Sequence, residues 1–132
     1  MSLVLDTHAV VWYLLGSNQL AETTYALIDG AARGEPTYVS AVSVIEIIYL
    51  LERQRISVSA LNRLADELSN ENPSFVIVPV DYRVAMRMRE IPRNIVPDMR
   101  DRIIAATALC LGFPLVTRDR RIQAAGIQTI WK

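Results

Sequence analysis

The sequence predicts an α/β fold in which a short, mostly parallel sheet lies between helices on both of its faces. Short apolar runs that suit buried strands alternate with helical patterns of about ten or more residues, which is typical of such folds. No unit repeats along the chain and no low-complexity linker interrupts it. The length of 132 residues fits one domain with a real core, since single domains commonly contain about 100 to 200 residues. We therefore expect one domain over residues 1–132.

The elements expected in the first half are two strands, each followed by a helix, and one further helix between them. The run SLVL is a short apolar strand at 2–5, and Gly16 suits the left-handed cap that closes the helix after it. A second helical pattern ends at Gly34, and the β-rich segment TYVS leads directly into an apolar helix. In order, we expect a strand at 2–5, helices at 7–16 and 20–33, a strand at 37–40 and a helix at 41–53.

The second half continues the alternation, with clear capping signals. Ser57 and Asp81 each stand directly before a helical pattern and suit the N-cap position. Two prolines in IPRNIVP predict a loop, and Gly112 ends the next helix. In order, we expect a helix at 58–69, a strand at 75–80, a helix at 82–91, a helix at 100–112, and strands at 114–117 and 128–131, with residues 118–126 connecting the last two.

Composition and cysteine count predict a cytoplasmic protein without a membrane segment. The longest charge-free apolar stretch, Ile103 to Val116, is shorter than the roughly 20 residues that a bilayer requires. No basic segment precedes the first apolar residues, and Asp6 interrupts them early, so no secretory signal is expected. The single cysteine, Cys110, excludes an internal disulfide and a cysteine-based metal site, and its position suits a small buried hydrophobe on a helix.

The charge total carries no signature of nucleic-acid binding, because 14 basic residues balance 14 acidic ones. All basic residues except Lys132 are arginines. A guanidinium group matches phosphate oxygens well, although surface arginines that form ordinary ion pairs would give the same composition. The arginines close to the acidic residues discussed below are Arg100, Arg102, Arg118, Arg120 and Arg121.

Five carboxylates stand where the strands of such a sheet end. Asp6 follows the first strand, Glu46 lies in the second turn of the helix after TYVS, and Asp119 lies two positions after PLVT. Asp98 and Asp101 begin the helix that leads into PLVT. Because sites in open α/β sheets form outside the carboxyl ends of the strands, these five side chains are expected to converge.

Most of these acids also have a structural explanation. Asp98 and Asp101 suit the N-cap and the first turn of their helix, which would stabilise its start by roughly 1 kcal/mol. Asp6 and Asp119 could cap helices in the same way. Asp101 differs, because Ile104, Ala105 and Ala108 share its helical face and should direct it toward the sheet.

Glu46 interrupts an otherwise apolar helix, and no arginine stands three or four residues from it. It also lies too far into the helix to act as a cap. Because burying an unpaired carboxylate is costly, the group should protonate or meet a cation. The alternatives are a helix edge that lets Glu46 reach water, or an arginine from elsewhere in the fold.

A cluster of these acids predicts a hard divalent cation. Two like charges about 4 Å apart repel by roughly 4 kcal/mol at an effective dielectric constant of 20. Oxygen ligands suit Mg²⁺ or Mn²⁺, whereas Zn²⁺ usually recruits histidine or cysteine. We expect His8, the only histidine, to be a packed or hydrogen-bonded residue of the first helix.

The order and spacing of four segments resemble the PIN-domain ribonucleases, and within them the VapC toxins of bacterial and archaeal toxin–antitoxin pairs. These segments cover nearly the whole chain: LVLDTHAVVWYL, VSAVSVIEI, DMRDRIIAATALCLGFPLVTRDRRI and IQTIW. The resemblance implies a three-layer α/β/α PIN-like domain. The acids of the family match Asp6, Glu46, Asp101 and Asp119, which would gather around one or two Mg²⁺ or Mn²⁺ ions.

The resemblance also implies roles for neighbouring residues. Asp98 is an accessory candidate, since related toxins often read DPFDR where this chain reads DMRDR. Thr7 and Thr117 match hydroxyl positions beside the metal-binding acids, Ser43 is a further hydroxyl candidate, and His8 matches a common DTH variant. The candidates for contacts with RNA phosphates are Arg100, Arg102, Arg118 and Arg120.

By this resemblance, the chain is expected to be a toxin that hydrolyses RNA phosphodiester bonds with a water activated by Mg²⁺ or Mn²⁺. Its partners would be an RNA substrate, a VapB-type antitoxin that occupies the active-site groove, and a second copy in a homodimer. Trp12, Leu50 and Leu51 could contribute to such surfaces, although core packing is the role expected of each.

Three other functions compete with this one. The first is a non-catalytic or differently targeted nucleic-acid-binding module of the same fold. A phosphoacceptor signalling domain normally needs a lysine in its acidic site, and the only lysine here is Lys132. A haloacid-dehalogenase-type phosphatase needs an aspartate two positions after its nucleophile, where His8 stands.

Overall fold

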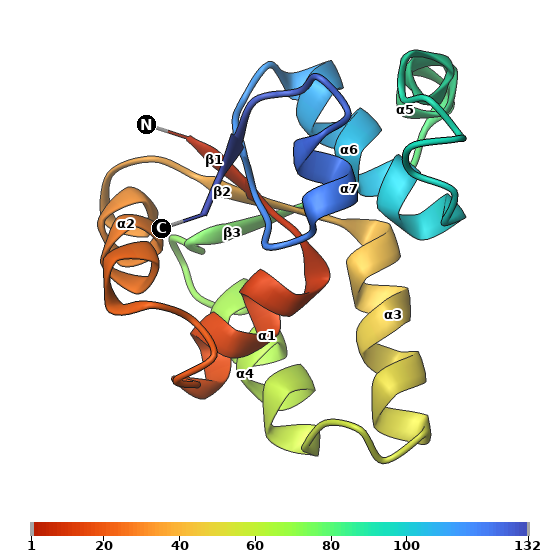
Figure 1. The fold of residues 1–132 in the computed structure, drawn as a ribbon. Coiled ribbons are helices and arrows are strands. Elements are labelled where there is room, and N and C mark those ends of the chain that lie inside the picture. Colours follow the sequence, from red (N-terminus) through yellow and green to blue (C-terminus); the bar gives the residue numbers. More distant parts are fainter. Residues whose placement is uncertain (1, 132) are drawn as a thin grey trace.

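The computed structural model describes residues 2–131, except for the side chains of residues 32 and 33. Its helices and strands follow the predicted order (Figure 1). The elements are β1 (Leu3–Leu5), α1 (Thr7–Leu15), α2 (Glu22–Gly34), β2 (Thr37–Ser40), α3 (Ala41–Glu52), α4 (Val58–Leu68), β3 (Phe75–Val78), α5 (Tyr82–Arg87), the 3₁₀ helix η1 (Met88–Glu90), α6 (Met99–Leu111), β4 (Leu115–Val116), α7 (Arg120–Gln123) and β5 (Thr129–Ile130).

The five strands form one sheet in the order β3-β2-β1-β4-β5, and every neighbouring pair is parallel. The central strand β1 places Val4 opposite Tyr38 on one side and Leu115 on the other. Because the strands are parallel, their carboxyl ends meet at one edge of the sheet. The predicted parallel α/β architecture is therefore confirmed.

Successive residues of β1 face different helical layers, as the period of a strand requires. Leu3 and Leu5 belong to a buried cluster shared with α1, α2 and α4, whereas Val4 belongs to a second cluster shared with α5, α6 and α7. Helix α3 contributes to both, through Ile47 and Val42 respectively. The fold thus has three layers, and α3 stands beside the carboxyl edge of the sheet, next to α1 and α6 (Figure 1).

Several element boundaries differ from the sequence-based expectation. Strand β3 ends at Val78 instead of residue 80, because Pro79 has no N–H to donate to a neighbouring strand. The helix expected at 82–91 is α-helical only to Arg87 and continues as η1. The connection at 118–126 contains α7, a single turn that is too short to produce a helical periodicity in the sequence.

Two further expectations concern Cys110 and membrane insertion. Cys110 lies on α6 and is half-buried against the second cluster. Within residues 2–131, none of the helices combines the length and the apolar character that crossing a bilayer demands.

Candidate active site

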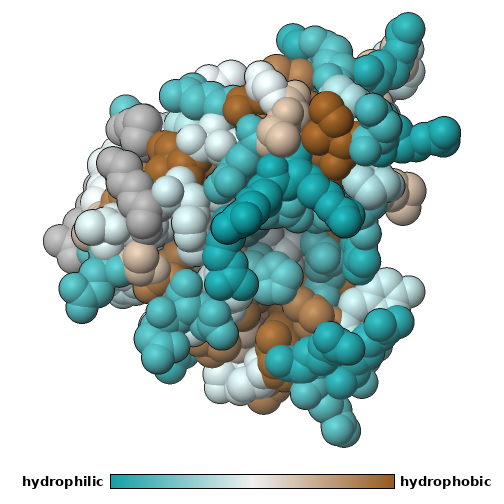
Figure 2. Space-filling model, in the orientation of Figure 1, coloured by the Kyte–Doolittle hydropathy of each residue, from teal (hydrophilic) through white to brown (hydrophobic). Residues whose placement is uncertain are grey.

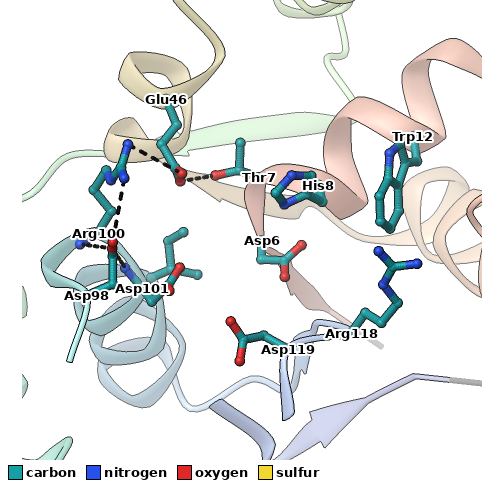
Figure 3. A pocket seen from close by; sticks show the side chains of 11 residues that line it. Asp6, Thr7, His8, Trp12, Glu46, Asp98, Arg100, Asp101, Arg118 and Asp119 are labelled. Atoms are coloured by element: carbon teal, nitrogen blue, oxygen red, sulfur yellow. Dashed lines mark hydrogen bonds and ion pairs between the residues drawn. The ribbon is translucent and has the colours of Figure 1, made fainter. Parts of the chain in front are cut away.

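A cavity of ≈ 350 Å³ opens at the carboxyl edge of the sheet. On the face shown in Figure 2, hydrophilic side chains gather around a hollow that lies between α1 and α3 of Figure 1. The cavity receives side chains from α1, α3, α6 and the segment between β4 and α7 (Figure 3). It is lined by Asp6, Thr7, His8, Trp12, Glu46, Asp98, Arg100, Asp101, Ile104, Arg118 and Asp119. All five acids singled out in the sequence therefore meet in one place.

Three of the five carboxylates also cap helices, so the capping explanation holds alongside their convergence. Asp6 Oδ1 accepts a hydrogen bond from the Ala9 N–H at 2.8 Å at the start of α1. Asp119 Oδ1 accepts one from the Arg121 N–H at 2.8 Å at the start of α7. Asp98 caps α6 in the same way. In each cap the hydrogen bonds go to Oδ1, and the cap fixes the position of a carboxylate that lines the cavity.

Asp6 lies at the bottom of the acidic group and is buried, with 8% of its surface exposed. Burial raises the pKa of its carboxyl group, while hydrogen bonds from the Thr117 hydroxyl and the Ala9 N–H lower it. The buried Thr117 Oγ1 also accepts a hydrogen bond from the Asp119 N–H at 3.1 Å. Thr117 therefore links two of the acids, which suits the supporting position predicted for it.

The carboxyl group of Asp101 has a strongly raised pKa. Loss of solvent contact first, and then the negative charges of Asp98, Asp119, Glu46 and Asp6 in that order, together raise the pKa of its carboxyl group to about 7. At neutral pH this group is consequently close to half protonated. A carboxyl group with so high a pKa in a cavity is typical of a functional site and indicates a place where a cation would be stabilised.

Glu46 has partners that its own helix could not supply. The Thr7 hydroxyl donates a hydrogen bond to Glu46 Oε1 at 2.6 Å, and Thr7 Oγ1 lies 3.0 Å from Ser43 Oγ. Since the single Thr7 proton is used on Glu46, the buried Ser43 hydroxyl donates to Thr7. Arg100 Nη1 of α6 lies 3.8 Å from Glu46 Oε2. The alternative of an arginine from elsewhere in the fold is thus realised.

The four candidate arginines separate into two groups. Arg100 and Arg118 line the cavity at opposite ends, as Figure 3 shows. Arg102 instead donates to the carbonyl groups of Met88, at 2.7 Å, and Ile91, at 3.2 Å. Its guanidinium group therefore holds the segment before α6, and this contact explains its sequence position without RNA. Arg120 is exposed on α7 and does not line the cavity.

His8 and Trp12 form the end of the cavity where Arg118 lies. The His8 side chain is exposed, and its ring centroid is 5.3 Å from that of Trp12. His8 thus packs against an aromatic ring, as expected, while its side chain remains exposed. The sequence pointed to Trp12 only as a core or partner-surface residue. Its signal was the spacing of four from His8, which places both side chains on one face of α1.

The donor set of the cavity suits a hard cation. Asp6, Glu46, Asp101 and Asp119 offer carboxylate oxygens, the ligands that Mg²⁺ and Mn²⁺ prefer. Among the residues that the structure describes, no three acidic, histidine or cysteine side chains stand close enough to hold one ion between them. Three carboxylates could share an ion here only after side-chain movement. The lowered charge of Asp101 at neutral pH and the pairing of Glu46 with Arg100 both reduce repulsion in the present arrangement.

Known proteins are similar to this chain in sequence and in fold. The chain is 29% identical to ribonuclease VapC22 of Mycobacterium tuberculosis over 128 residues, which cover 93% of this chain and 91% of the relative. The structure of VapBC2 from Rickettsia felis, bound to a DNA fragment from its promoter, superimposes with a TM-score of 0.75 at 16% identity and full coverage of both chains. FitAcB from Neisseria gonorrhoeae gives a TM-score of 0.67 at 27% identity, over 97% of this chain and 96% of that one.

The sequence also matches the PIN domain family over residues 3–127. That range begins in β1 and ends after α7, so it includes every acidic residue of the cavity. The chain is a member of the PIN domain family.

Proposed function

We propose that this protein is a metal-dependent endoribonuclease and the toxin of a VapBC-type toxin–antitoxin pair. The observation that carries this proposal is the cavity in which five carboxylates from four parts of the chain meet, one of them with a pKa of about 7. Such a concentration of negative charge suits the stabilisation of a cation next to a phosphodiester. Membership of the PIN family and the likeness to ribonuclease VapC22 support it.

Asp6, Glu46, Asp101 and Asp119 are the residues that would hold Mg²⁺ or Mn²⁺, with Asp98 as an accessory. When bound, such an ion supplies positive charge that lowers the pKa of a water and offsets charge on the phosphoryl oxygens. Thr7 and Ser43 orient Glu46 through their hydroxyl chain, and Thr117 orients Asp6 and Asp119. Residues that orient metal ligands in this way commonly influence metal affinity.

Arg100 and Arg118 are placed to receive the RNA backbone on either side of the acids. Arg100 is half-exposed and pairs with Glu46 and with Asp98, whose Oδ2 lies 3.5 Å from Arg100 Nη2. Arg118 is exposed at the other end of the cavity. A guanidinium group at each end would attract a strand whose central phosphate lies at the carboxylates.

We further propose that the protein acts in the cytoplasm, binds a VapB-type antitoxin and forms a homodimer. The names of the related structures describe VapBC complexes from Rickettsia felis and Salmonella typhimurium. Helix α3 offers an apolar surface for such partners, because Ile45, Ile48 and Tyr49 are exposed on it next to the cavity. Leu50 and Leu51 are half-buried, so they contribute less to this surface than their neighbours.

Cleavage of structured RNA by the wild type and by Asp6→Asn, with Mg²⁺ or Mn²⁺ and with EDTA, tests the activity. Asparagine keeps an oxygen that can accept the Ala9 hydrogen bond, so the variant should fold. We expect divalent-dependent cleavage by the wild type only, with 5′-phosphate and 3′-hydroxyl ends. Equal cleavage by both proteins, or cleavage that survives chelation, would contradict the proposal.

A thermal melt separates the enzyme from a non-catalytic module of the same fold. If the carboxylates bind an ion, Mn²⁺ should raise the melting temperature of the wild type and raise that of Asp6→Asn less, because binding to the native state alone stabilises it. No response of either protein would favour the non-catalytic module.

A further inference from the structure

Arg118 and Trp12 lie together at the end of the cavity that faces away from Glu46. The Arg118 Cζ atom lies 4.6 Å from the centroid of the Trp12 ring. His8 adjoins the same indole, and all three side chains line the cavity (Figure 3). Two aromatic rings and one planar cation thus line the same cavity as the acids.

The partners of Arg118 are unusual for an arginine next to several carboxylates. It directly precedes Asp119 in the chain, yet among residues 2–131 no carboxylate lies within ion-pair distance of its guanidinium group. Its partners are the Trp12 ring and Gln19 Oε1, the latter at 3.4 Å. Arg100, at the other end, pairs with two acids. The charge of Arg118 therefore remains available to a ligand.

The indole of Trp12 is held in place by the protein. It is half-buried, and its ring meets Trp131 edge-on with centroids 6.1 Å apart and an angle of 61° between the planes. An aromatic side chain that is already ordered loses little conformational entropy when a ligand packs on it. Because the Arg118 guanidinium already lies over this ring, the two side chains form one stack, and a flat ligand can pack on its exposed arginine end.

We propose that Trp12, Arg118 and His8 form a binding site for one unpaired nucleobase next to the phosphate that is cleaved. This inference rests on the ribonuclease function proposed above and names the substrate as a single-stranded segment of RNA. Bases that are released from a duplex stack on aromatic rings and on arginine planes, and every base offers a flat face for this contact. A base inside a duplex is already stacked on its neighbours and cannot occupy the site.

The chemistry of arginine allows the site to be distinguished from a simple phosphate contact. A lysine at position 118 would keep the positive charge and could still attract a phosphate, but it lacks the planar group that stacks. Arg118→Lys should therefore lose the contribution of the base and keep that of the backbone. Trp12→Leu keeps an apolar side chain and removes the aromatic face.

The test measures binding of three labelled strands to Asp6→Asn in Mg²⁺, so that cleavage does not interfere. The strands are an oligoadenylate, the same oligoadenylate annealed to its complement, and a base-free strand of abasic nucleotides. Asp6→Asn should prefer the single-stranded oligoadenylate. Adding Trp12→Leu or Arg118→Lys should weaken that binding by roughly 5- to 150-fold, the range that corresponds to loss of about 1–3 kcal/mol of base stacking. Binding of the base-free strand should stay within about twofold of its original strength, since its phosphate contacts are kept.

Arg83→Lys is the matched control, because Arg83 is an exposed arginine on α5, with 80% of its side chain accessible, and does not line the cavity. It should leave all three affinities unchanged. If Trp12→Leu loses its cooperative thermal melt through the Trp131 contact, Arg118→Lys alone decides, since its side chain is on the surface.

Two results would overturn the inference and can be told apart from failure of the ribonuclease itself. If wild-type protein cleaves RNA while Trp12→Leu and Arg118→Lys keep the preference for the base-bearing strand, the nucleobase site is rejected and the ribonuclease function stands. If the wild type neither cleaves RNA nor binds any of the strands, both proposals fail together.

Discussion

Replacing Asp101 with asparagine should stabilise the metal-free protein, and the gain should grow as the pH rises. The pKa of Asp101 is about 7 in the folded protein, compared with 3.8 for an unperturbed group. At a pH between these two pKa values, Asp101 has lost its proton in the unfolded chain but keeps it in the folded protein. Ionisation of Asp101 therefore opposes folding. The penalty begins as the pH rises above about 4 and is complete above about 7.

The magnitude follows from the same two pKa values. At about 1.4 kcal/mol per pKa unit, the rise from 3.8 to about 7 corresponds to at most about 4 kcal/mol at alkaline pH. Partial exposure of Asp101 screens part of this, and asparagine loses a favourable charge in the first turn of α6 that contributes about 0.3–1 kcal/mol. We therefore expect a net gain of about 1–2 kcal/mol near pH 8, shrinking toward zero near pH 4.

Urea denaturation in EDTA at several pH values measures this difference directly. Asp81→Asn is the matched control, because Asp81 likewise stands at the start of a helix but its pKa is lowered, first by the Val84 N–H. Its ionised form stabilises the native state, so the substitution should reduce stability above its pKa and have no effect in strong acid. A loss of stability for Asp101→Asn near pH 8, or a gain independent of pH, would refute the raised pKa of Asp101 in the folded protein.

Three further variants test other contacts of the site. Glu46→Gln should reduce divalent-dependent cleavage at least about tenfold. The melting temperature should change little, because the amide oxygen can still accept the Thr7 hydrogen bond. Loss of cleavage together with a clear drop in melting temperature would indicate unfolding instead. Thr7→Val should weaken Mn²⁺ binding, measured by calorimetry, by about 10- to 100-fold. It should also lower the free energy of unfolding by about 1–3 kcal/mol, since the Ser43 hydroxyl loses its partner. Unchanged Mn²⁺ affinity would exclude a role of Thr7 in orienting Glu46. Arg102→Met should lower the free energy of unfolding by about 1–3 kcal/mol through loss of its two carbonyl contacts. Its affinity for RNA should stay unchanged. Weaker RNA binding by a folded variant would show that Arg102 contacts the substrate after all.

The expected behaviour of Glu46 changes most between sequence and structure. Taken from the sequence, its removal should relieve repulsion and stabilise the metal-free protein. In the structure the Thr7 hydroxyl and the Arg100 guanidinium already compensate its charge. The pKa shift instead falls on Asp101, where loss of solvent contact and then the neighbouring negative charges raise the pKa of the carboxyl group.

Local sequence patterns were sufficient to predict the order of the helices and strands and the convergence of the acidic residues. Strand and helix periods, glycine ends and aspartate caps depend on residues within a few positions of one another, so the order of elements and the acidic edge of the sheet could be predicted. The single turn of α7 and the early end of β3 were the exceptions, because four residues show no period and one proline removes one donor.

The sequence by itself determined which carboxylates line the cavity and that they gather at the carboxyl edge of the sheet. Only the tertiary structure decided where the arginines go: Arg100 to Glu46, Arg102 to backbone carbonyls, and Arg118 to Trp12. A guanidinium group ends a long flexible side chain. It can form an ion pair with a carboxylate, donate hydrogen bonds to a carbonyl group or stack on an aromatic ring. Which of these lies within reach depends on residues far apart in the chain, and their positions are settled only when the helices pack against the sheet.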